Sequence, residues 1–396
     1  MAILILSNSR GKEIPYSKWL SSTNEELYLL GSSDYDLKNP SYKLIKGFET
    51  YESNDLVKEA EQLLEKGGFK KIIAKAEADL IRGALLREKF NIPGQSYDSA
   101  LAFRNKFKMK SILATKYIPI ADFCLVHKKE DAIRFAEVHG FPLIIKPVDA
   151  SGSFDILKIN TINELQSISN EKIKNKLLET FIYGEMYHID GVVIYNEIKF
   201  SYPSKYITSC LAYQQNQPLK SQILEFENPL RDRLQHFVKE VIQVMPMPQH
   251  STFHAEVFHT PNDGLVLCEI ASRTGGGRVR KSLNVSFGVD IDEHWIKAQC
   301  DIPYPVNQIL PNRPNILSGW ILLTPIPATL KKFAEGNLPS WVIEYRQIGK
   351  EGQEYKNANK STDCVASLMV TGNSEKQIQE RLDYVEKWFY DNTQWE

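Results

Sequence analysis

Short apolar runs alternate with amphipathic runs throughout the first hundred residues. Three apolar runs have the length of strands: residues 2–6, 27–30 and 72–74. Residues 54–65 and 78–89 instead place leucine and alanine at the spacing of a helix face. Strands that alternate with helices are typical of a parallel sheet covered by helices. We therefore predict an N-terminal α/β unit that ends near the Ile-Pro-Gly turn at residues 92–94.

The length and charge of the chain limit the classes of protein it can form. At 396 residues it is longer than a usual single domain, so several structural units around a large core are expected. Its 48 basic and 49 acidic side chains give a formal net charge of −1. This balance does not indicate nucleic acid or a membrane as the main partner. Any bound anion must be held by a local arrangement of charge.

The cysteines and the apolar runs favour a cytoplasmic protein. The five cysteines are scattered without a CxxC pair, which is typical of reduced thiols rather than of a zinc site or a disulfide framework. The apolar run at the start follows no basic segment, and we interpret it as a strand rather than a signal peptide. None of the apolar runs approaches the ~18 residues needed to span a bilayer. A cytoplasmic location is therefore expected.

The pattern beyond residue 97 predicts further helices and strands. The predicted helices are residues 98–115, 130–138, 228–244, 292–299 and 374–390. The predicted strands are residues 122–126, 143–146, parts of 177–194, 318–323 and 365–370. Residues 203–218 are polar and aromatic and are predicted to be an irregular insertion. The predicted domains are residues 1–97, 98–180, 181–300 and 301–396.

Two glutamates are predicted to face each other across a hairpin. Residues 253–258 and 265–271 have strand character, and Thr-Pro-Asn-Asp-Gly between them is typical of a turn. If the hairpin is symmetric about residues 262–263, Glu256 lies opposite Glu269 on one face. Like charges so placed repel unless a cation lies between them, and carboxylates are ligands that Mg²⁺ prefers. From spacing alone, two exposed glutamates on a solvated face are the simpler interpretation.

An arginine and a glycine run follow the second glutamate. Arg273 lies four residues beyond Glu269, where its guanidinium could bind a phosphate or carboxylate through two hydrogen bonds. The glycines at 275–277 let the backbone approach a ligand and offer N–H groups to an anion. A glycine run alone is more often a flexible loop. The combination of two acids, an arginine and three glycines is the more specific signal.

Two lysines are candidates for a phosphate site. Lys146 ends an apolar strand and precedes the small-residue loop 149–153, whose N–H groups could cover a phosphate held by the ammonium. A strand-end lysine that only reaches water is an equally good interpretation. Lys106 lies on a predicted helix with Lys108 and Lys110, where a solvated basic face is simpler. The chain has neither a GxxxxGK[ST] loop nor a GxGxxG after a strand.

Four segments in order resemble the ATP-grasp superfamily, closest to its carboxylate–amine ligase branch. EADLIRGALLREKFNIPG with RNKFKMK resembles the end of the N-terminal domain and the first ATP lysine of that family. FPLIIKPVDASGS resembles the second ATP lysine with its loop, and ETFIYGE resembles the adenine and ribose hinge. HAEVF with CEIASR resembles the magnesium and catalytic segment. The resemblance covers residues 70–290 and implies an α/β (α+β) ATP-grasp fold: a Rossmann-like N-terminal domain, then central and C-terminal ATP-grasp lobes.

Eight residues are implied by this resemblance to bind ATP. Lys106 and Lys146 would contact the α- and β-phosphates, and Gly152 and Ser153 would close over the γ-phosphate. In the hinge, main-chain groups of the first and fourth residues would bind adenine and the final acid would hold the ribose. The hinge residues concerned are Glu179, Phe181, Ile182 and Glu185.

The resemblance also implies a metal site and an acid pocket. Glu256 and Glu269 would bind one or two Mg²⁺ ions, with Mn²⁺ as a substitute, and Lys146 and Arg273 are the implied catalytic residues. Ala271 stands where family members often have a further asparagine ligand, which puts a complete two-metal site in question. The acid substrate would be held by Arg273, Gly275, Gly276, Gly277, Arg278 and His188, although a structural role suits His188 equally well.

The activity implied by the resemblance is formation of an amide or peptide bond. ATP would phosphorylate a carboxylate to an acyl phosphate, and an amine would displace phosphate, with ADP as the other product. An amino acid or similar small acid is the expected substrate, with secondary-metabolite biosynthesis as one setting and a homodimer as one assembly. The enzyme alternatives are loading of a carrier-protein thiol and carboxylation. A catalytically silent ATP-binding regulatory protein is the non-enzyme alternative, and the retained lysines, glutamates and arginine argue against it.

Overall fold

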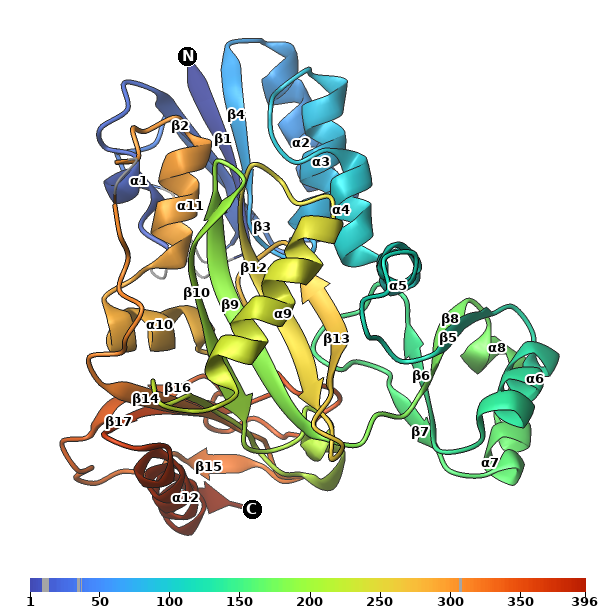
Figure 1. Cartoon of the computed structure of the whole chain (residues 1–396). Coiled ribbons are helices and arrows are strands. Elements are labelled where there is room, and N and C mark those ends of the chain that lie inside the picture. Colours follow the sequence, from blue (N-terminus) through green and yellow to red (C-terminus); the bar gives the residue numbers. More distant parts are fainter. Residues whose placement is uncertain (9–13, 34–35, 37, 306–307) are drawn as a thin grey trace.

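The computed structural model describes residues 1–8, 14–33, 36, 38–305 and 308–396. These residues form a four-stranded N-terminal sheet, a four-stranded small sheet, an eight-stranded large sheet and a two-stranded ribbon (Figure 1). Among the described residues, none of the helices combines the length and the apolar character needed to cross a membrane.

The N-terminal sheet is parallel, with strand order β3-β2-β1-β4. Its strands are β1 (Ala2–Ser7), β2 (Glu26–Ser32), β3 (Leu44–Phe48) and β4 (Phe69–Ala74). Ile3 and Ile5 of β1 pack into the main core, whereas Leu4 and Leu6 pack into a second core on the opposite face. Because both faces are covered, β1 is apolar along its whole length. The predicted parallel sheet is confirmed.

Helices cover this sheet as the spacing predicts. They are α1 (Tyr16–Trp19), α2 (Asn54–Glu65) and α3 (Asp79–Lys89). The buried face of α2 consists of Leu56, Ala60, Leu63 and Leu64, which pack with the outer face of the sheet. The polar remainder of the helix faces solvent, so its amphipathic pattern follows from its position.

The predicted helix at residues 98–115 is wrong as a single helix. The chain forms α4 (Tyr97–Arg104) and α5 (Lys106–Ala114), separated at Asn105, which has an extended backbone with ψ of 106°. The Asn105 side chain accepts a hydrogen bond from the backbone N–H of Lys108 and so caps α5. An asparagine side chain competes with the helical hydrogen bonds in this way. The break makes Lys106 the first residue of a new helix.

The small sheet has strand order β5-β8-β6-β7, and all its pairs are antiparallel. Its elements are β5 (Phe123–Val126), α6 (Lys129–His139), β6 (Leu143–Pro147), β7 (Leu157–Ile159), α7 (Ile162–Ser167), α8 (Asn170–Ile173) and β8 (Lys176–Thr180). It encloses its own core, separate from the main one. Figure 1 shows this sheet and its three helices projecting to one side of the molecule.

The large sheet is antiparallel, with strand order β13-β12-β9-β10-β11-β14-β17-β16. Its strands are β9 (Glu185–Ile194), β10 (Glu197–Tyr206), β11 (Leu219–Ile223), β12 (His250–His259), β13 (Leu265–Ala271), β14 (Leu317–Leu323), β16 (Val342–Gln347) and β17 (Ala366–Gly372). The sheet therefore continues across residue 300. The division into four domains stays a prediction.

Helices cover both faces of the large sheet. They are α9 (Arg231–Val244), α10 (Val279–Phe287), α11 (Ile291–Gln299) and α12 (Glu375–Asn392). Contacts of α11 with β4, β9 and β12 join the N-terminal sheet to the large sheet. Strand β15 (Leu330–Lys332), which follows β14 in the sequence, pairs with the C-terminal strand β18 (Gln394–Trp395) as a two-stranded ribbon.

The predicted irregular insertion at residues 203–218 is wrong over its first part. Strand β10 continues to Tyr206, and Pro203 lies within it opposite Ile189 of β9. The irregular segment begins at residue 207 and contains the short 3₁₀ helix Ala212–Gln215. Polar composition misled the prediction, because Lys205 and Tyr206 at this end of β10 line a cavity.

We expect substitution of Gly191 by alanine to destabilise the large sheet. A Cβ atom there would overlap the carbonyl oxygen of Phe200 and lie 2.5 Å from the ring of Phe253. Overpacking of this kind costs about 1–3 kcal/mol. Gly276→Ala is the control, because a Cβ at Gly276 meets no atom within 4 Å. Urea unfolding should show a lower unfolding free energy for Gly191→Ala alone, and equal values would contradict the close packing.

Candidate active site

The hairpin of β12 and β13 places two acids opposite each other. Glu256 pairs with Glu269, as the symmetric hairpin predicts. Beyond this pair the register shifts, so that Val257 faces Leu267 and Cys268 is the extra residue of a bulge. The expected symmetry therefore holds at the glutamates and fails toward the turn. A bulge of this kind is common beside active sites, because it redirects side chains.

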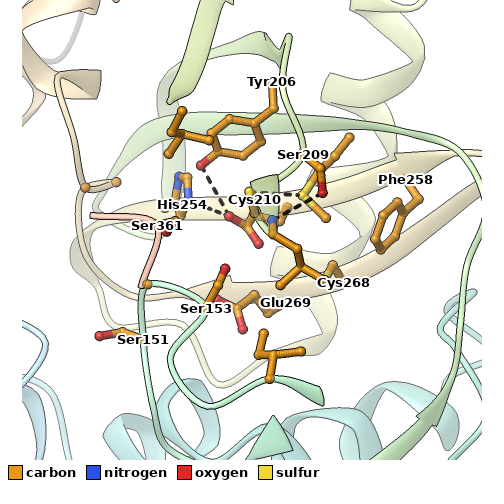
Figure 2. Close-up of a pocket in the computed structure, with 18 of the residues that line it drawn as sticks. Ser151, Ser153, Tyr206, Ser209, Cys210, His254, Phe258, Cys268, Glu269 and Ser361 are labelled. Atoms are coloured by element: carbon orange, nitrogen blue, oxygen red, sulfur yellow. Dashed lines mark hydrogen bonds and ion pairs between the residues drawn. The ribbon is translucent and has the colours of Figure 1, made fainter. Parts of the chain in front are cut away.

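A cavity of about 1310 Å³ lies at the meeting of the three sheets. Fourteen of the predicted site residues line it: Lys106, Lys146, Gly152, Ser153, Glu179, Phe181, Ile182, Glu185, Glu256, Glu269, Arg273, Gly275, Gly276 and Gly277. Figure 2 shows Ser151 and Ser153 of the loop after β6 around the same cavity as Glu269 and His254. Arg278 and His188 are not among the lining residues. The structure thus brings together segments spread over 170 positions of the sequence, from Lys106 to Gly276.

Lys146 is buried beside a carboxylate. It is the next-to-last residue of β6, and its ammonium lies 2.8 Å from Glu179 of β8, the neighbouring strand. Lys110 of α5 approaches the same carboxyl group at 3.2 Å. Burial raises the pKa of a carboxyl group, but Lys110 and Lys146 reverse that effect and hold the pKa of Glu179 below its ordinary value. Burial alone would lower the pKa of Lys146, yet Glu179 raises it, so the lysine is charged.

Lys106 links the start of α5 to the glutamate pair. Its ammonium lies 3.1 Å from Glu269 and donates a hydrogen bond of 2.6 Å to the carbonyl of Ala150 in the loop after β6. Burial opposes ionisation of Glu269, but Lys106 and Lys146 lower the pKa of Glu269 to about 2. Glu269 is therefore an anion at neutral pH. The solvated basic face considered for Lys106 is not what the structure contains.

Arg273 is held by a residue that the sequence did not indicate. Its guanidinium and that of Arg104 both donate to the carboxylate of Glu77, just beyond β4. Burial would raise the pKa of Glu77, but Arg273 and Arg104 hold it below its ordinary value. Glu77 lies at the carboxyl end of a parallel strand, where ligand sites of α/β sheets occur. That position is the signal that could have identified it.

The glycine loop packs closely on a buried polar cluster. A Cβ at Gly275 would lie 2.7 Å from Asp190 and 2.7 Å from His254, so a side chain there would displace the loop. Gly277 has a φ of +62° and lies against the ring of Trp320, which also lines the cavity. Arg278 instead points away, because it forms an ion pair with Glu344 of β16.

A hydrogen-bonded cluster of His188, Asp190 and His254 lies next to Glu256. The ring nitrogens of His188 and His254 lie 2.5 Å and 2.8 Å from the two carboxylate oxygens of Asp190. His188 also contacts Ser221 at 2.7 Å, and its side chain is fully buried. In this structure His188 therefore contacts Asp190 and Ser221 and does not line the cavity. Burial lowers the pKa of a histidine, but Asp190 reverses this and raises the pKa of His254 to about 10. Separations of 2.5–2.8 Å are those of hydrogen bonds.

His254 connects this cluster to the hairpin. Its second ring nitrogen lies 3.5 Å from Glu256, and Tyr206 donates to the same glutamate at 3.3 Å. The sequence motifs did not indicate a role for the His254 side chain. Because residues two apart share one face of a strand, the pair His254 and Glu256 was the available signal.

The hinge segment combines aromatic and charged groups. Glu185 accepts a hydrogen bond from Tyr187 at 2.9 Å and pairs with Lys205 at 2.5 Å. Lys205 and Tyr187 lower the pKa of Glu185, so it is ionised. The ammonium of Lys158 lies 4.0 Å from the ring centre of Phe181. The main-chain role expected for Glu179 and Ile182 stays a prediction, while the Glu179 side chain is engaged by lysines.

The loop after β6 is held from two sides. Gly152 and Ser153 have φ angles of +65° and +57°, so both lie in the left-handed region. The hydroxyl of Tyr213 donates to the carbonyl of Ser153 at 2.7 Å, and the backbone N–H of Ser361 donates to the carbonyl of Gly152 at 2.9 Å. Two connections between strands of the large sheet, which contain Tyr213 and Ser361, thus hold this loop at the cavity.

The fold combines a parallel N-terminal sheet with a small and a large antiparallel sheet, and lysines, glutamates and an arginine line the cavity between them. The RimK-like ATP-grasp domain family matches residues 103–198, which include α5, the small sheet and β9. This part of the chain therefore matches an ATP-grasp domain, as its motifs indicate.

Similar proteins include ligases of amino acids. The L-arginine-specific L-amino acid ligase of Bacillus subtilis is 26% identical over 351 residues, which cover 83% of this chain and 81% of that protein. The crystal structure of L-amino acid ligase from Bacillus licheniformis superposes with a TM-score of 0.79 at 16% identity, over 100% of this chain and 98% of the other. The biotin carboxylase domain of Hydrogenobacter thermophilus 2-oxoglutarate carboxylase, in complex with MgADP, gives a TM-score of 0.68 at 14% identity and covers 100% and 90%.

We expect Glu179→Gln to destabilise the protein, because it leaves Lys146 and Lys110 buried without their counter-ion. Removing one partner of a buried ion pair costs about 3–5 kcal/mol. Since folding lowers the pKa of Glu179 from its ordinary 4.5, its contribution is present above pH 4.5 and is lost as the pH falls below it. Urea unfolding at pH 7 and at lower pH measures this effect. As the pH falls, the unfolding free energy of the variant should decrease less than that of the wild type.

The matched control for this change is Glu171→Gln. Glu171 lies exposed in the same small domain, on α8. Its variant should unfold like the wild type at every pH. If both variants lost stability with acid as steeply as the wild type, the buried ion pair would not contribute as described.

Proposed function

We propose that this protein is an ATP-dependent carboxylate–amine ligase that joins amino acids through an acyl phosphate. The observation that carries the proposal is the convergence of two opposed glutamates, two lysines and an arginine on one cavity. The B. subtilis relative, an L-arginine-specific L-amino acid ligase, supports an amino acid as the acid and an amine as the acceptor. Carboxylases among the similar structures share the fold at 14% identity and do not bear on the acceptor.

The nucleotide would lie between the small sheet and the large sheet. Lys106 and Lys146 would hold its phosphates, with Gly152 and Ser153 above the γ-phosphate. The hinge residues from Glu179 to Glu185 would hold adenine and ribose, with Phe181 against the base. Both lysines already form ion pairs with carboxylates. Such preorganised charges stabilise the phosphoryl group without reorganising at the moment of reaction.

The residues of the hairpin fit a magnesium site. Glu256 and Glu269 line the cavity from opposed positions and offer the hard oxygen donors that Mg²⁺ prefers. Bound there, Mg²⁺ would neutralise charge on the phosphates, and Mn²⁺ would be a substitute. Ala271 is buried and has no donor side chain, so the two glutamates are the ligands in this proposal.

The acid substrate would lie between Arg273 and the glycine loop. Glu77 holds the guanidinium of Arg273 at the edge of the cavity, where it can neutralise charge on the carboxylate and on the transferring phosphoryl group. The same Glu77 carboxylate lines the cavity and could receive the ammonium of an amino acid. Gly275, Gly276 and Trp320 also line this cavity.

The chemistry is transfer of the γ-phosphoryl group to a substrate carboxylate, with ADP as the leaving group. The amine then attacks the acyl carbon, loses its proton and releases phosphate. Arg273 would stabilise the negative oxygen of that tetrahedral species. Water must be excluded, since it would hydrolyse the acyl phosphate. The loop after β6, closed by Tyr213 and Ser361, provides that exclusion.

We expect the protein to form dipeptides and release ADP and phosphate in equal amounts. L-Amino acids should be tested in pairs with ATP and Mg²⁺, with ADP measured by a coupled assay and the product identified by mass. Hydroxylamine in place of the amine should trap a hydroxamate of the activated acid. Release of AMP would contradict the acyl phosphate. ADP release that required bicarbonate or a thiol would contradict the amine acceptor.

We expect Glu269→Gln to lower kcat by more than about 100-fold, because even the outer partners of metal ligands contribute about 10–100-fold. The change keeps the size of the side chain and removes the charge that a cation needs. The matched control is Glu65→Gln, since Glu65 is exposed at the end of α2 and does not line the cavity. Steady-state rates at saturating Mg²⁺ measure the effect. A near-normal rate would show that Glu269 is not a metal ligand.

A further inference from the structure

The C-terminal part of the chain contributes a loop to the phosphate end of the cavity. Residues 360–362 line the cavity together with the loop after β6. The backbone N–H of Ser361 donates to Gly152 at 2.9 Å. A Cβ added at Gly152 would lie 3.2 Å from the hydroxyl of Thr362 and 3.9 Å from a side-chain carbon of Lys360. The two loops are therefore in direct contact at the residue proposed to cover the γ-phosphate.

This loop has a defined shape. The carboxylate of Asp363 accepts a hydrogen bond of 2.9 Å from the backbone N–H of Asn359, and the backbone N–H of Asp363 donates to the carbonyl of Lys360 at 3.1 Å. Ser361 is buried at the contact with Gly152. The turn therefore presents Lys360 from a fixed backbone, so that only the side chain has to be ordered when a ligand binds.

The ammonium of Lys360 is less closely paired than those of Lys106, Lys146 and Lys205, which also line the cavity. Lys106 lies 3.1 Å from Glu269, Lys146 lies 2.8 Å from Glu179, and Lys205 lies 2.5 Å from Glu185.

The corresponding distance from Lys360 to Asp363 is 3.9 Å, at the limit of an ion pair. Its side chain is 46% exposed, so it can move toward a ligand at little cost. An ammonium group that can move in this way, next to the loop after β6, is suited to bind an oxyanion such as a phosphate.

We propose that Lys360 binds the γ-phosphoryl group of the nucleotide, as a third lysine supplied by the C-terminal segment. The inference rests on the proposed function, because it takes the loop after β6 to cover the phosphates. It adds a residue and a chain segment that the sequence motifs do not include. Lys360 would neutralise a γ-oxygen as the group transfers, and Thr362 would support Gly152 from behind.

The proposal is tested by comparing nucleotides with and without a γ-phosphoryl group. We expect Lys360→Met to weaken binding of AMPPNP about 10-fold, the loss of one charge-assisted hydrogen bond. Binding of ADP should change by less than about twofold, because the contact is confined to the γ-group. Isothermal titration calorimetry in the presence of Mg²⁺ gives both dissociation constants. The matched control is Lys356→Met, an exposed lysine four positions earlier that does not line the cavity.

The outcomes separate this inference from the proposed function. If the wild type binds both nucleotides and Lys360→Met binds AMPPNP as tightly as the wild type, the inference is overturned and the proposed function stands. Equal weakening for AMPPNP and ADP would also overturn it. A raised KM for the amine with unchanged nucleotide affinity would assign Lys360 to a substrate carboxylate and overturn the phosphoryl assignment. If the wild type bound neither nucleotide, the proposed function itself would fail.

Discussion

Repulsion between Glu256 and Glu269 is the constraint to which much of this structure responds. The hairpin puts the two carboxylates directly opposite each other, and Glu269 is ionised at neutral pH. Like charges so placed are stable only where cations surround them. Those cations come from separate places: Lys106 from the start of α5, Lys146 from the small sheet and Arg273 from the loop after β13. The three sheets therefore have to meet at the hairpin for its charges to be compensated.

Two of the compensating cations, Lys146 and Arg273, have an acid partner of their own. Glu179 lies beside Lys146, and Glu77 accepts hydrogen bonds from Arg273. A buried ion pair adds little net stability, since desolvation offsets the attraction. Its contribution is to fix the position of a charge before a ligand arrives. The small sheet and the N-terminal sheet each hold one cation at the cavity in this way, which explains why catalysis would need both.

The local part of this site could be predicted from the sequence, and the tertiary part could not. Alternation and turn chemistry were enough to pair Glu256 with Glu269, because a hairpin is a local structure. The bulge at Cys268 was missed, since it depends on how the strand packs rather than on the turn. Glu77 and Lys360 were missed because each depends on a contact between segments that are about 200 residues apart in the sequence. Glu77 contacts Arg273, and Ser361, next to Lys360, contacts Gly152.

The large sheet explains how one loop can be held by distant parts of the chain. Strand β17 follows the loop at residues 360–362, and it belongs to the same sheet as β12, which carries Glu256. The position of Lys360 is therefore fixed relative to Glu256 through hydrogen-bonded strands. The loop after β6 belongs to the small sheet, and it meets this frame at Ser361 and Tyr213. A change in the position of the small sheet would thus alter the proposed phosphate contacts of Gly152 and Lys360 together, while the proposed metal ligands of the hairpin kept their geometry.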